Sequence, residues 1–153
     1  MVKDDFEKIV NKYSDAMFRC AYTYCSNMQD AEDIIQEVFY KYLLKKPAFK
    51  DESHEKAWFL RVTINTSKNY VHSFWHRNVD SIQQDISYVS SEELEILDLV
   101  RKLPEKYRIV IELYYWEGYS IKEIAKILNK NNSTVGTWFE RAKKMLREYM
   151  ERE

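Results

Sequence analysis

Hydrophobic residues recur every three or four positions along most of this chain, which is the spacing of one face of an α-helix. The first stripe predicts a helix over about residues 3–25, and a polar break separates it from a second helix over about residues 31–46. Pro47 follows, and a residue that precedes proline disfavours the helical backbone. Ser53 is a suitable N-cap for a third helix that reaches about His76.

The second half of the chain begins with a change of pattern. Residues 79–90 are polar and acidic and lack a clear helical period, which is typical of a linker. Ser90 or Ser91 can cap a fourth helix. Pro104 at a first helical position and Gly118 just past the end bracket a fifth helix. Two more helices follow in "SIKEIAKILNKNNSTVGTWFERAKKML", joined by a short polar break.

This succession of helices, with only 2 Gly and 2 Pro in 153 residues, predicts an all-α fold of two small helical domains. Residues 1–78 are expected to form a three- or four-helix bundle, and residues 98–153 are expected to end in the two helices of the quoted stretch. The linker between them, residues 79–97, carries 5 acidic residues and no basic one. The last domain carries 12 basic and 9 acidic residues, so the net charge of −1 conceals a basic segment.

The residue content argues against several classes of function. Isolated glycines cannot form a phosphate-binding loop, and no catalytic arrangement of residues stands out, so we expect neither an enzyme nor a cofactor. His72 and His76 lie four apart but lack a further ligand, so no metal site is predicted. Cys20 and Cys25 fall on different faces of one helix, and no apolar run approaches the length of a membrane span. These features indicate a reduced, cytoplasmic protein without membrane insertion.

The stretch "SIKEIAKILNKNNSTVGTWFERAKKML" has the pattern of a helix-turn-helix. In its second helix, Val135, Phe139 and Ala142 form a packing stripe, which leaves the opposite face exposed. Small hydroxyl side chains on such a face suit base edges, and Arg and Lys suit phosphates. An ordinary helical hairpin with a solvated basic face is the alternative. The exposed residues are expected to be Ser133, Thr134, Gly136, Thr137, Glu140, Arg141 and Lys144.

The stretch "LPEKYRIVIELYYWEGYSIKEIAKILNKNNSTVGTWFERAKKMLRE" has a Leu-Pro start, a helix that ends in Gly, and a basic tail. Between them stand the patterns S-x-x-E-I-A and T-V-x-x-x-x-x-R-A. In these features it resembles region 4 of the extracytoplasmic-function (ECF) group of the sigma-70 family. The matching residues are Leu103, Pro104, Gly118, Ser120, Glu123, Ile124, Ala125, Thr134, Val135, Arg141 and Ala142.

The N-terminal half carries a separate resemblance. "DAEDIIQEVFYKYL" is similar to the region 2 helix that docks on RNA polymerase. "AWFLRVTINTSKNYVHSFWHR" is similar to the next helix, which handles promoter DNA, with Trp58, Arg61 and Asn65 at the family's spacing. The two matches occur in the family's order and cover most of the chain.

The resemblance implies a sigma factor that binds core RNA polymerase, directs it to promoters and opens promoter DNA. Region 2 would dock on the β′ clamp helices and bind the minus-ten element, and region 4 would bind the minus-thirty-five element and the β flap. An anti-sigma factor is a further expected partner. The expected polymerase-binding residues are Asp30, Glu32, Asp33, Gln36 and Glu37. The expected minus-ten residues are Arg61, Asn65, Lys68, Asn69, Tyr70, His72, Trp75, His76 and Arg77. The seven exposed residues of the second helix would bind the minus-thirty-five element.

The sequence departs from the family at two places. Family members often carry a dense run of Arg at the end of the third helix, whereas here only Lys68 and Arg77 are permanently charged. We therefore expect weaker attraction of DNA phosphates and a flatter salt dependence of DNA binding. Gly136 and Trp138 stand where relatives often have Lys or Arg. A glycine within a helix lowers stability by about 1 kcal/mol relative to alanine. Close approach of the helix to DNA, or simple evolutionary drift, would explain why glycine stands here. Trp138 would pack on its own domain or on another protein.

Two other functions stay open at this point. A stand-alone helix-turn-helix regulator would bind DNA as a dimer but would have no need of a polymerase-docking helix. A helical protein-interaction module would not require a basic second helix. The N-terminal resemblance favours the sigma factor over both.

Overall fold

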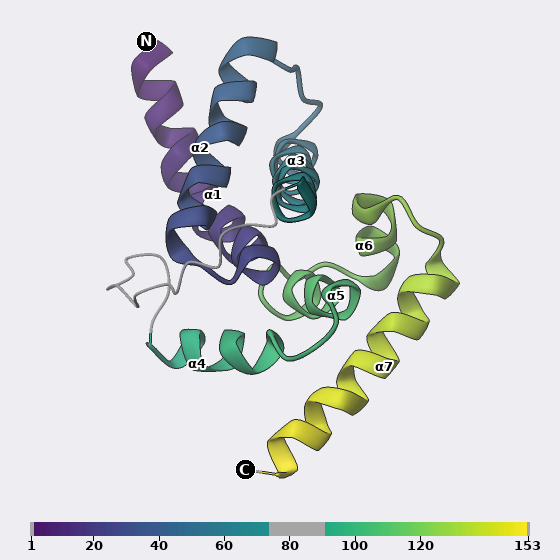
Figure 1. The fold of residues 1–153 in the computed structure, drawn as a ribbon. Coiled ribbons are helices and arrows are strands. Elements are labelled where there is room, and N and C mark those ends of the chain that lie inside the picture. Colours follow the sequence, from purple (N-terminus) through teal and green to yellow (C-terminus); the bar gives the residue numbers. More distant parts are fainter. Residues whose placement is uncertain (1, 74–90, 153) are drawn as a thin grey trace. The chain divides into compact units, whose positions relative to one another are not determined.

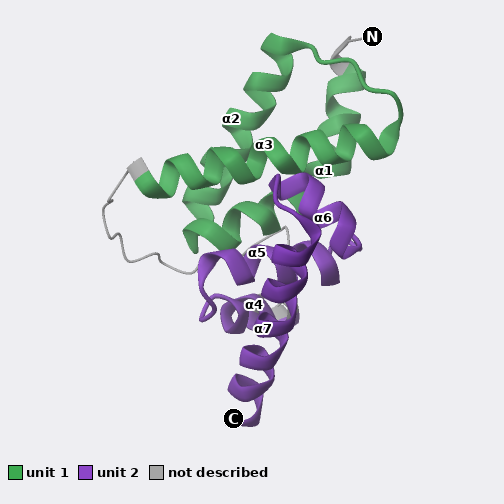
Figure 2. Ribbon diagram, turned by 90° about the vertical axis from the view of Figure 1, so that its right-hand side faces the viewer, with its two compact units in different colours: residues 1–88 green, residues 89–153 purple. Residues whose placement is uncertain are grey.

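The computed structural model describes residues 2–73 and 91–152, which form seven α-helices and no strand (Figure 1). The all-α prediction is confirmed. The chain separates into two compact units, residues 1–88 and 89–153 (Figure 2). Residues 91–97, which the domain prediction places in the linker, are helical, while residues 79–90 lie outside the described part of the chain. The boundaries of the acidic linker therefore stay a prediction.

Three helices form the first unit: α1 (Val2–Cys25), α2 (Met28–Lys45) and α3 (Glu52–Ser73). Each packs on the other two, so their apolar stripes meet in one core. Phe59 of α3 is fully buried. Its ring lies 5.0 to 6.4 Å, centroid to centroid, from five other aromatic rings. Those rings belong to Tyr13, Phe39, Tyr42, Phe49 and Trp58.

Side-chain caps fix the starts of the helices in this unit. Asn27 caps α2, because its side-chain oxygen accepts a hydrogen bond from the Asp30 amide at 2.9 Å. The predicted cap of α3 is wrong: Ser53 lies inside the helix, and Asp51 Oδ1 accepts from the His54 amide at 2.8 Å. The helix therefore begins two residues earlier than the sequence indicated.

Four helices form the second unit: α4 (Ser91–Val100), α5 (Glu105–Tyr115), α6 (Ile121–Leu128) and α7 (Asn132–Glu151). The long helix α7 packs on the other three. Aliphatic side chains from each helix fill the core, among them Leu97, Val110, Leu113, Ile124 and Val135. This core is more aliphatic than that of the first unit, and it also buries the rings of Tyr107 and Phe139.

The two predicted ends of α5 hold in outline. Pro104, predicted to be the first helical residue, is instead the N-cap, so the helix begins one residue later, at Glu105. Gly118 has a φ of 77°, in the left-handed region that favours glycine, and it turns the chain toward α6. The connection between α5 and the helix-turn-helix is therefore short and well defined.

Candidate polymerase and nucleic-acid interfaces

An acidic face runs along α2, on the side away from the core of the first unit. Asp33, Gln36 and Glu37 are all exposed, and they share this face because they lie three and four positions apart. Glu32 is half-buried beside them. The Glu37 carboxylate forms an ion pair with Lys41 Nζ at 3.3 Å, which is a solvent-exposed pair of small energetic value.

Asp30 occupies a different setting from the rest of the predicted polymerase-binding set. It is half-buried, and its Oδ1 accepts a hydrogen bond from the Tyr70 hydroxyl at 2.9 Å. This bond joins the first turn of α2 to the last turns of α3. The structure thus links one residue predicted to bind polymerase with one predicted to bind the minus-ten element, and the pair has a part in holding the two helices together.

Beyond Glu37, α2 exposes three apolar residues for which the sequence predicted no partner. Tyr40 is 61% exposed, Leu44 is 65% exposed and Leu43 is 42% exposed. Tyr40 and Leu44 lie three and seven positions beyond Glu37, which keeps them on the same side of the helix. The helical spacing of these positions from Glu37 was the signal that could have identified them. We call Asp33, Gln36, Glu37, Tyr40 and Leu44 the α2 face.

A polar face runs along α3. Arg61, Asn65, Asn69 and His72 are exposed and follow one another at steps of four, four and three residues. Lys68 is half-buried at the edge of this row. The predicted residues Trp75, His76 and Arg77 lie outside the described residues.

The buried side of α3 carries hydroxyl groups that are satisfied within the helix. Thr63 donates to the Phe59 carbonyl and Ser67 to the Thr63 carbonyl, both at 2.7 Å. Trp58 also turns to the core, since its ring lies 5.0 Å from Phe59 and 6.2 Å from Tyr42. The aromatic residue at the family's spacing therefore supports the helix that presents Arg61 and Asn65.

The helix-turn-helix in the second unit is fixed by local hydrogen bonds. Ser120 and Glu123 form a capping box at the start of α6, where each side chain accepts the other residue's amide, at 3.2 and 2.9 Å. Asn129 ends α6 in the left-handed conformation, with a φ of 57°. Asn131 then caps α7 by accepting the Thr134 amide at 2.8 Å. The polar break seen in the sequence is thus a tight turn with two asparagines in defined conformations.

The exposed face of α7 carries most of the residues predicted to bind the minus-thirty-five element. Ser133, Thr137, Glu140, Arg141 and Lys144 are exposed, while Thr134 and Gly136 are half-buried at the edges of this face. We call these seven residues the α7 face. The opposite side is buried by Val135, Phe139 and Ala142, as the packing stripe predicted.

Gly136 is not required by the packing of the chain. A Cβ atom built on it would meet no heavy atom within 4 Å. Any larger residue would therefore find open space at this position, at the level of the α7 face.

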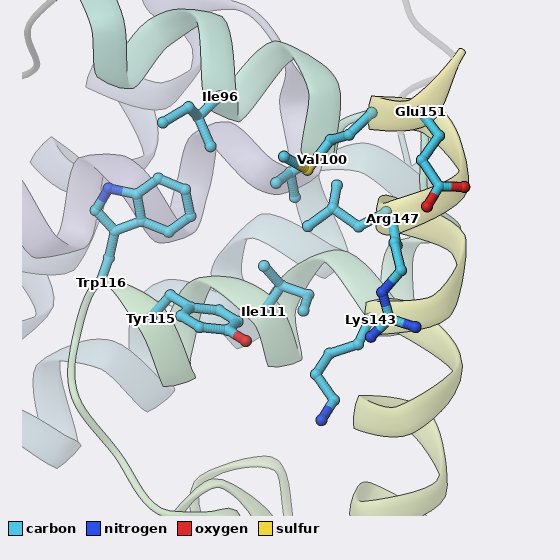
Figure 3. Close-up of a pocket in the computed structure, with 10 residues that line it drawn as sticks. Ile96, Val100, Ile111, Tyr115, Trp116, Lys143, Arg147 and Glu151 are labelled. Carbon is cyan, nitrogen blue, oxygen red and sulfur yellow. The ribbon is translucent and has the colours of Figure 1, made fainter. Parts of the chain in front are cut away.

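A groove of ≈650 Å³ lies between α4, α5 and α7 (Figure 3). Ile96 and Val100 of α4, Ile111 and Tyr115 of α5, and Leu146 and Met150 of α7 give it an apolar floor and walls. Ile96 is 49% exposed and Met150 is 60% exposed. Charged side chains lie along α7 at its rim: Lys143, Arg147 and Glu151. Sequence periodicity could not show this groove, because it depends on how three separate helices pack.

Residues 2–73 and 91–152 contain neither a metal site nor a membrane-spanning helix. No group of three His, Cys, Asp or Glu side chains lies close enough to hold a metal ion in that part of the chain. None of the helices there combines the length and the apolar character needed to cross a membrane. Cys20 and Cys25, both within α1, are not joined by a disulfide bond.

The arrangement of two helical units, one of which contains a helix-turn-helix, is typical of DNA-binding transcription proteins. Comparison with known proteins gives the family. Residues 9–77 match the family model of sigma-70 region 2, and residues 93–146 match that of sigma-70 region 4. The chain is 30% identical over 137 residues to the ECF RNA polymerase sigma-E factor of Escherichia coli, covering 76% of this chain and 72% of that protein.

Other relatives agree over a longer span. The chain is 26% identical over 152 residues to RNA polymerase sigma factor SigV of Bacillus subtilis, covering 90% of this chain and 86% of that protein. Its fold is similar to that of the sigma factor RpoE of Bartonella quintana, solved with the anti-sigma factor NepR, with a TM-score of 0.78 and 21% identity over 96% of this chain and 97% of that one.

This chain belongs to the ECF group of the sigma-70 family of RNA polymerase sigma factors. Sigma factors are non-catalytic subunits that bind core RNA polymerase and promoter DNA to start transcription. The two regions of the family occur here in order, so a stand-alone helix-turn-helix regulator is not favoured.

Proposed function

We propose that the two units divide the work of this sigma factor, the first binding polymerase and the minus-ten element and the second binding the minus-thirty-five element. The observation that carries this division is the contrast between the acidic α2 face and the hydroxyl-rich, basic α7 face. An acidic surface repels the phosphates of DNA, whereas cations attract them. The protein would act in the cytoplasm, where it meets the polymerase.

The α2 face is the proposed contact with the β′ clamp helices. Its exposed carboxylates and amide give orientation and specificity, and the exposed apolar end formed by Tyr40 and Leu44 adds buried area. Tyrosine is often among the few residues that contribute most of the affinity of an interface, so Tyr40 is an expected anchor. Glu32 lies at the edge of this contact, and Asp30 supports it through its bond to Tyr70.

The polar face of α3 is the proposed contact with the minus-ten element. Arg61 and Lys68 would meet phosphates, and Asn65, Asn69 and His72 offer hydrogen-bonding groups to unpaired bases. Because few cations lie on the described part of this face, binding there should depend only weakly on salt. Trp75, His76 and Arg77 would extend the face beyond the described residues.

The α7 face is the proposed contact with the major groove of the minus-thirty-five element. The hydroxyl groups of Ser133, Thr134 and Thr137 suit base edges, and Arg141 and Lys144 suit bases or phosphates. The groove between α4, α5 and α7 would take an apolar helix of the β flap, since an exposed apolar channel with charged residues at its rim suits an amphipathic helix. An anti-sigma factor would compete for faces of this kind, as a partner of this class does bind the sigma factor RpoE of Bartonella quintana.

Site-specific photocrosslinking tests this division of work. A photoreactive phenylalanine analogue placed at Gln36 should crosslink to the β′ subunit, and one placed at Thr137 should crosslink to DNA upstream of the start site. Lys122 of α6 is exposed and belongs to neither face, so it is a matched control that should give little product. Crosslinking of Gln36 to DNA, or of Thr137 to polymerase alone, would contradict the proposal.

A further inference from the structure

The start of α7 carries a hollow that the α7 face does not fully describe. Ser133, Thr134, Thr137 and Trp138 line it, and its volume is ≈240 Å³. Three of these residues belong to the α7 face, and Trp138 is the additional one. The hydroxyl groups of the first three residues are the polar part of the lining. The indole ring and the methyl groups of the two threonines are the apolar part.

Trp138 is not fully buried in the core of the second unit. It is half-buried, and the Nζ atom of Lys106 lies 5.5 Å from the centroid of its ring. That distance falls within the range of a cation–π contact. Lys106 comes from the start of α5 and is itself exposed. The indole therefore contacts a surface cation from another helix while it lines the hollow.

The chemistry of base edges limits what a hollow with both polar and apolar walls on a recognition helix can accept. In the major groove the bases present hydrogen-bond donors and acceptors and one apolar group, the 5-methyl group of thymine. Aliphatic and aromatic side chains contact that methyl group, while hydroxyl groups bond to neighbouring donors and acceptors. The lining of this hollow combines both kinds of group.

We propose that the hollow receives the 5-methyl group of a thymine in the minus-thirty-five element, and that Trp138 is a specificity-determining residue for promoter choice. The inference rests on the proposed function of the α7 face. Arg141 lies three positions beyond Trp138, and Lys106 contacts its ring, so two cations that can meet phosphates lie near this residue of the hollow.

Gly136 gives the backbone of α7 room to approach the bases. A side chain there would have open space within the protein, so nothing in the chain itself calls for glycine. On the DNA side, a residue without Cβ lets the helix sit closer to the base edges. Close approach is what a shallow hollow requires, because a methyl group projects only a short distance from the thymine ring.

Replacing thymine by uracil tests the proposal, because it removes only the methyl group. Promoters would first be selected by the holoenzyme, made from core polymerase and the full chain, from a pool with a randomised upstream element. Each thymine of the selected element would then be replaced singly by uracil. At one position we expect about fourfold weaker binding of the holoenzyme, the effect of one buried methyl group. Methylated cytosine at that position should bind about fourfold better than cytosine.

Variants assign the effect to the hollow. Trp138→Ala should reduce the thymine-to-uracil difference below twofold, and Trp138→Phe should keep part of it. Thr137→Ser, which removes one methyl group and keeps the hydroxyl, should also reduce the difference and is mild enough to leave the fold intact. Lys106→Gln is the matched control: it should weaken binding to thymine and uracil duplexes alike and keep their ratio.

Two results would overturn the inference. One is equal binding of thymine and uracil at every selected position. The other is a thymine-to-uracil difference that Trp138→Ala and Thr137→Ser both leave unchanged. A holoenzyme that selects no upstream element at all would instead contradict the proposed function of α7, so the two failures are distinguishable.

Discussion

The α2 face and the α7 face are built on helices of similar length, 18 and 20 residues, yet they suit different partners. Both helices bury one side in their own unit and leave the other exposed. The exposed side of α2 begins with carboxylates and ends with apolar residues. The exposed side of α7 begins with small hydroxyl side chains and continues with cations. The proposed difference in partner therefore rests on the exposed stripes, since the buried stripes of both helices are similarly apolar.

The cores that hold these two faces also differ. The first unit relies on a cluster of aromatic rings around Phe59, whereas the second relies on aliphatic residues and on capping bonds in the turn before α7. Aromatic side chains bury large areas and pack with defined geometry, so they stabilise a small bundle of three helices. In the second unit the precise start of α7 matters more, because its first turns carry the residues proposed to contact bases.

The largest expected effect tests the core beneath the α2 face. Phe59→Ala removes the ring at the centre of the aromatic cluster and should lower the stability of the first unit by about 3–5 kcal/mol. Amide hydrogen exchange in α1, α2 and α3 would measure the loss. Tyr40→Ala, at an exposed position, should leave exchange there unchanged. Equal losses in the two variants would show that the cluster does not hold the unit together.

The next effect tests the α2 face. Glu37→Lys reverses one exposed charge and should weaken capture of core polymerase about thirtyfold, because an interface loses a favourable charge contact and gains a repulsive one. Competition with the labelled wild-type chain for core polymerase would measure it. The variant should remain folded, since the ion pair with Lys41 is exposed. Glu7→Lys on α1 is the matched control, and a similar loss there would point to net charge rather than to this face.

A smaller effect tests the α7 face. Arg141→Ala should weaken binding of the holoenzyme to its minus-thirty-five element about tenfold, and it should flatten the salt dependence if the guanidinium meets a phosphate. Filter binding at several salt concentrations would separate the two contributions. Lys126→Ala on α6, also exposed, should change neither quantity. Affinity that is unaffected by Arg141→Ala would remove this residue from the contact.

The smallest effect concerns Gly136. Gly136→Ala should raise the free energy of unfolding by about 1 kcal/mol, because alanine favours a helix interior and the added Cβ meets no other atom. The same variant should bind the minus-thirty-five element less well, because the backbone can no longer approach the bases as closely. Thermal melting and filter binding would measure the two quantities. A more stable variant with undiminished affinity would show that drift, rather than close approach, explains the glycine.

The sequence predicted most helices and the exposed stripe of α7 because both follow from local spacing. Val135, Phe139 and Ala142 all fall on the buried side, as their intervals require. The N-cap of α3 could not be predicted from local spacing, because Asp51 and Ser53 are both good capping residues and lie two positions apart. The structure decides between them, because the His54 amide donates a hydrogen bond to Asp51 Oδ1.

Contacts between different helices could not be predicted from the spacing of residues within one helix. The bond between Asp30 and Tyr70 joins residues 40 positions apart, and no helical interval relates them. Leu43 belongs to the apolar stripe of α2 in the sequence but is 42% exposed. A helix turns by about 100° per residue, so a position beside a buried one can already lie outside the cover of neighbouring helices. The groove of the second unit depends on three helices at once and has no signature in any of them.

Run-off transcription at increasing concentrations of the chain tests most directly whether the first unit captures polymerase and the second unit binds the minus-thirty-five element of the promoter. Transcription with Glu37→Lys should be low when the concentration of the sigma chain is limiting and should recover when the chain is in excess, because a higher concentration compensates for weak binding to polymerase. Transcription with Arg141→Ala should stay low at excess chain, because the holoenzyme forms but binds the promoter poorly. If excess chain rescues both variants, or neither, the division of work between the two units is contradicted.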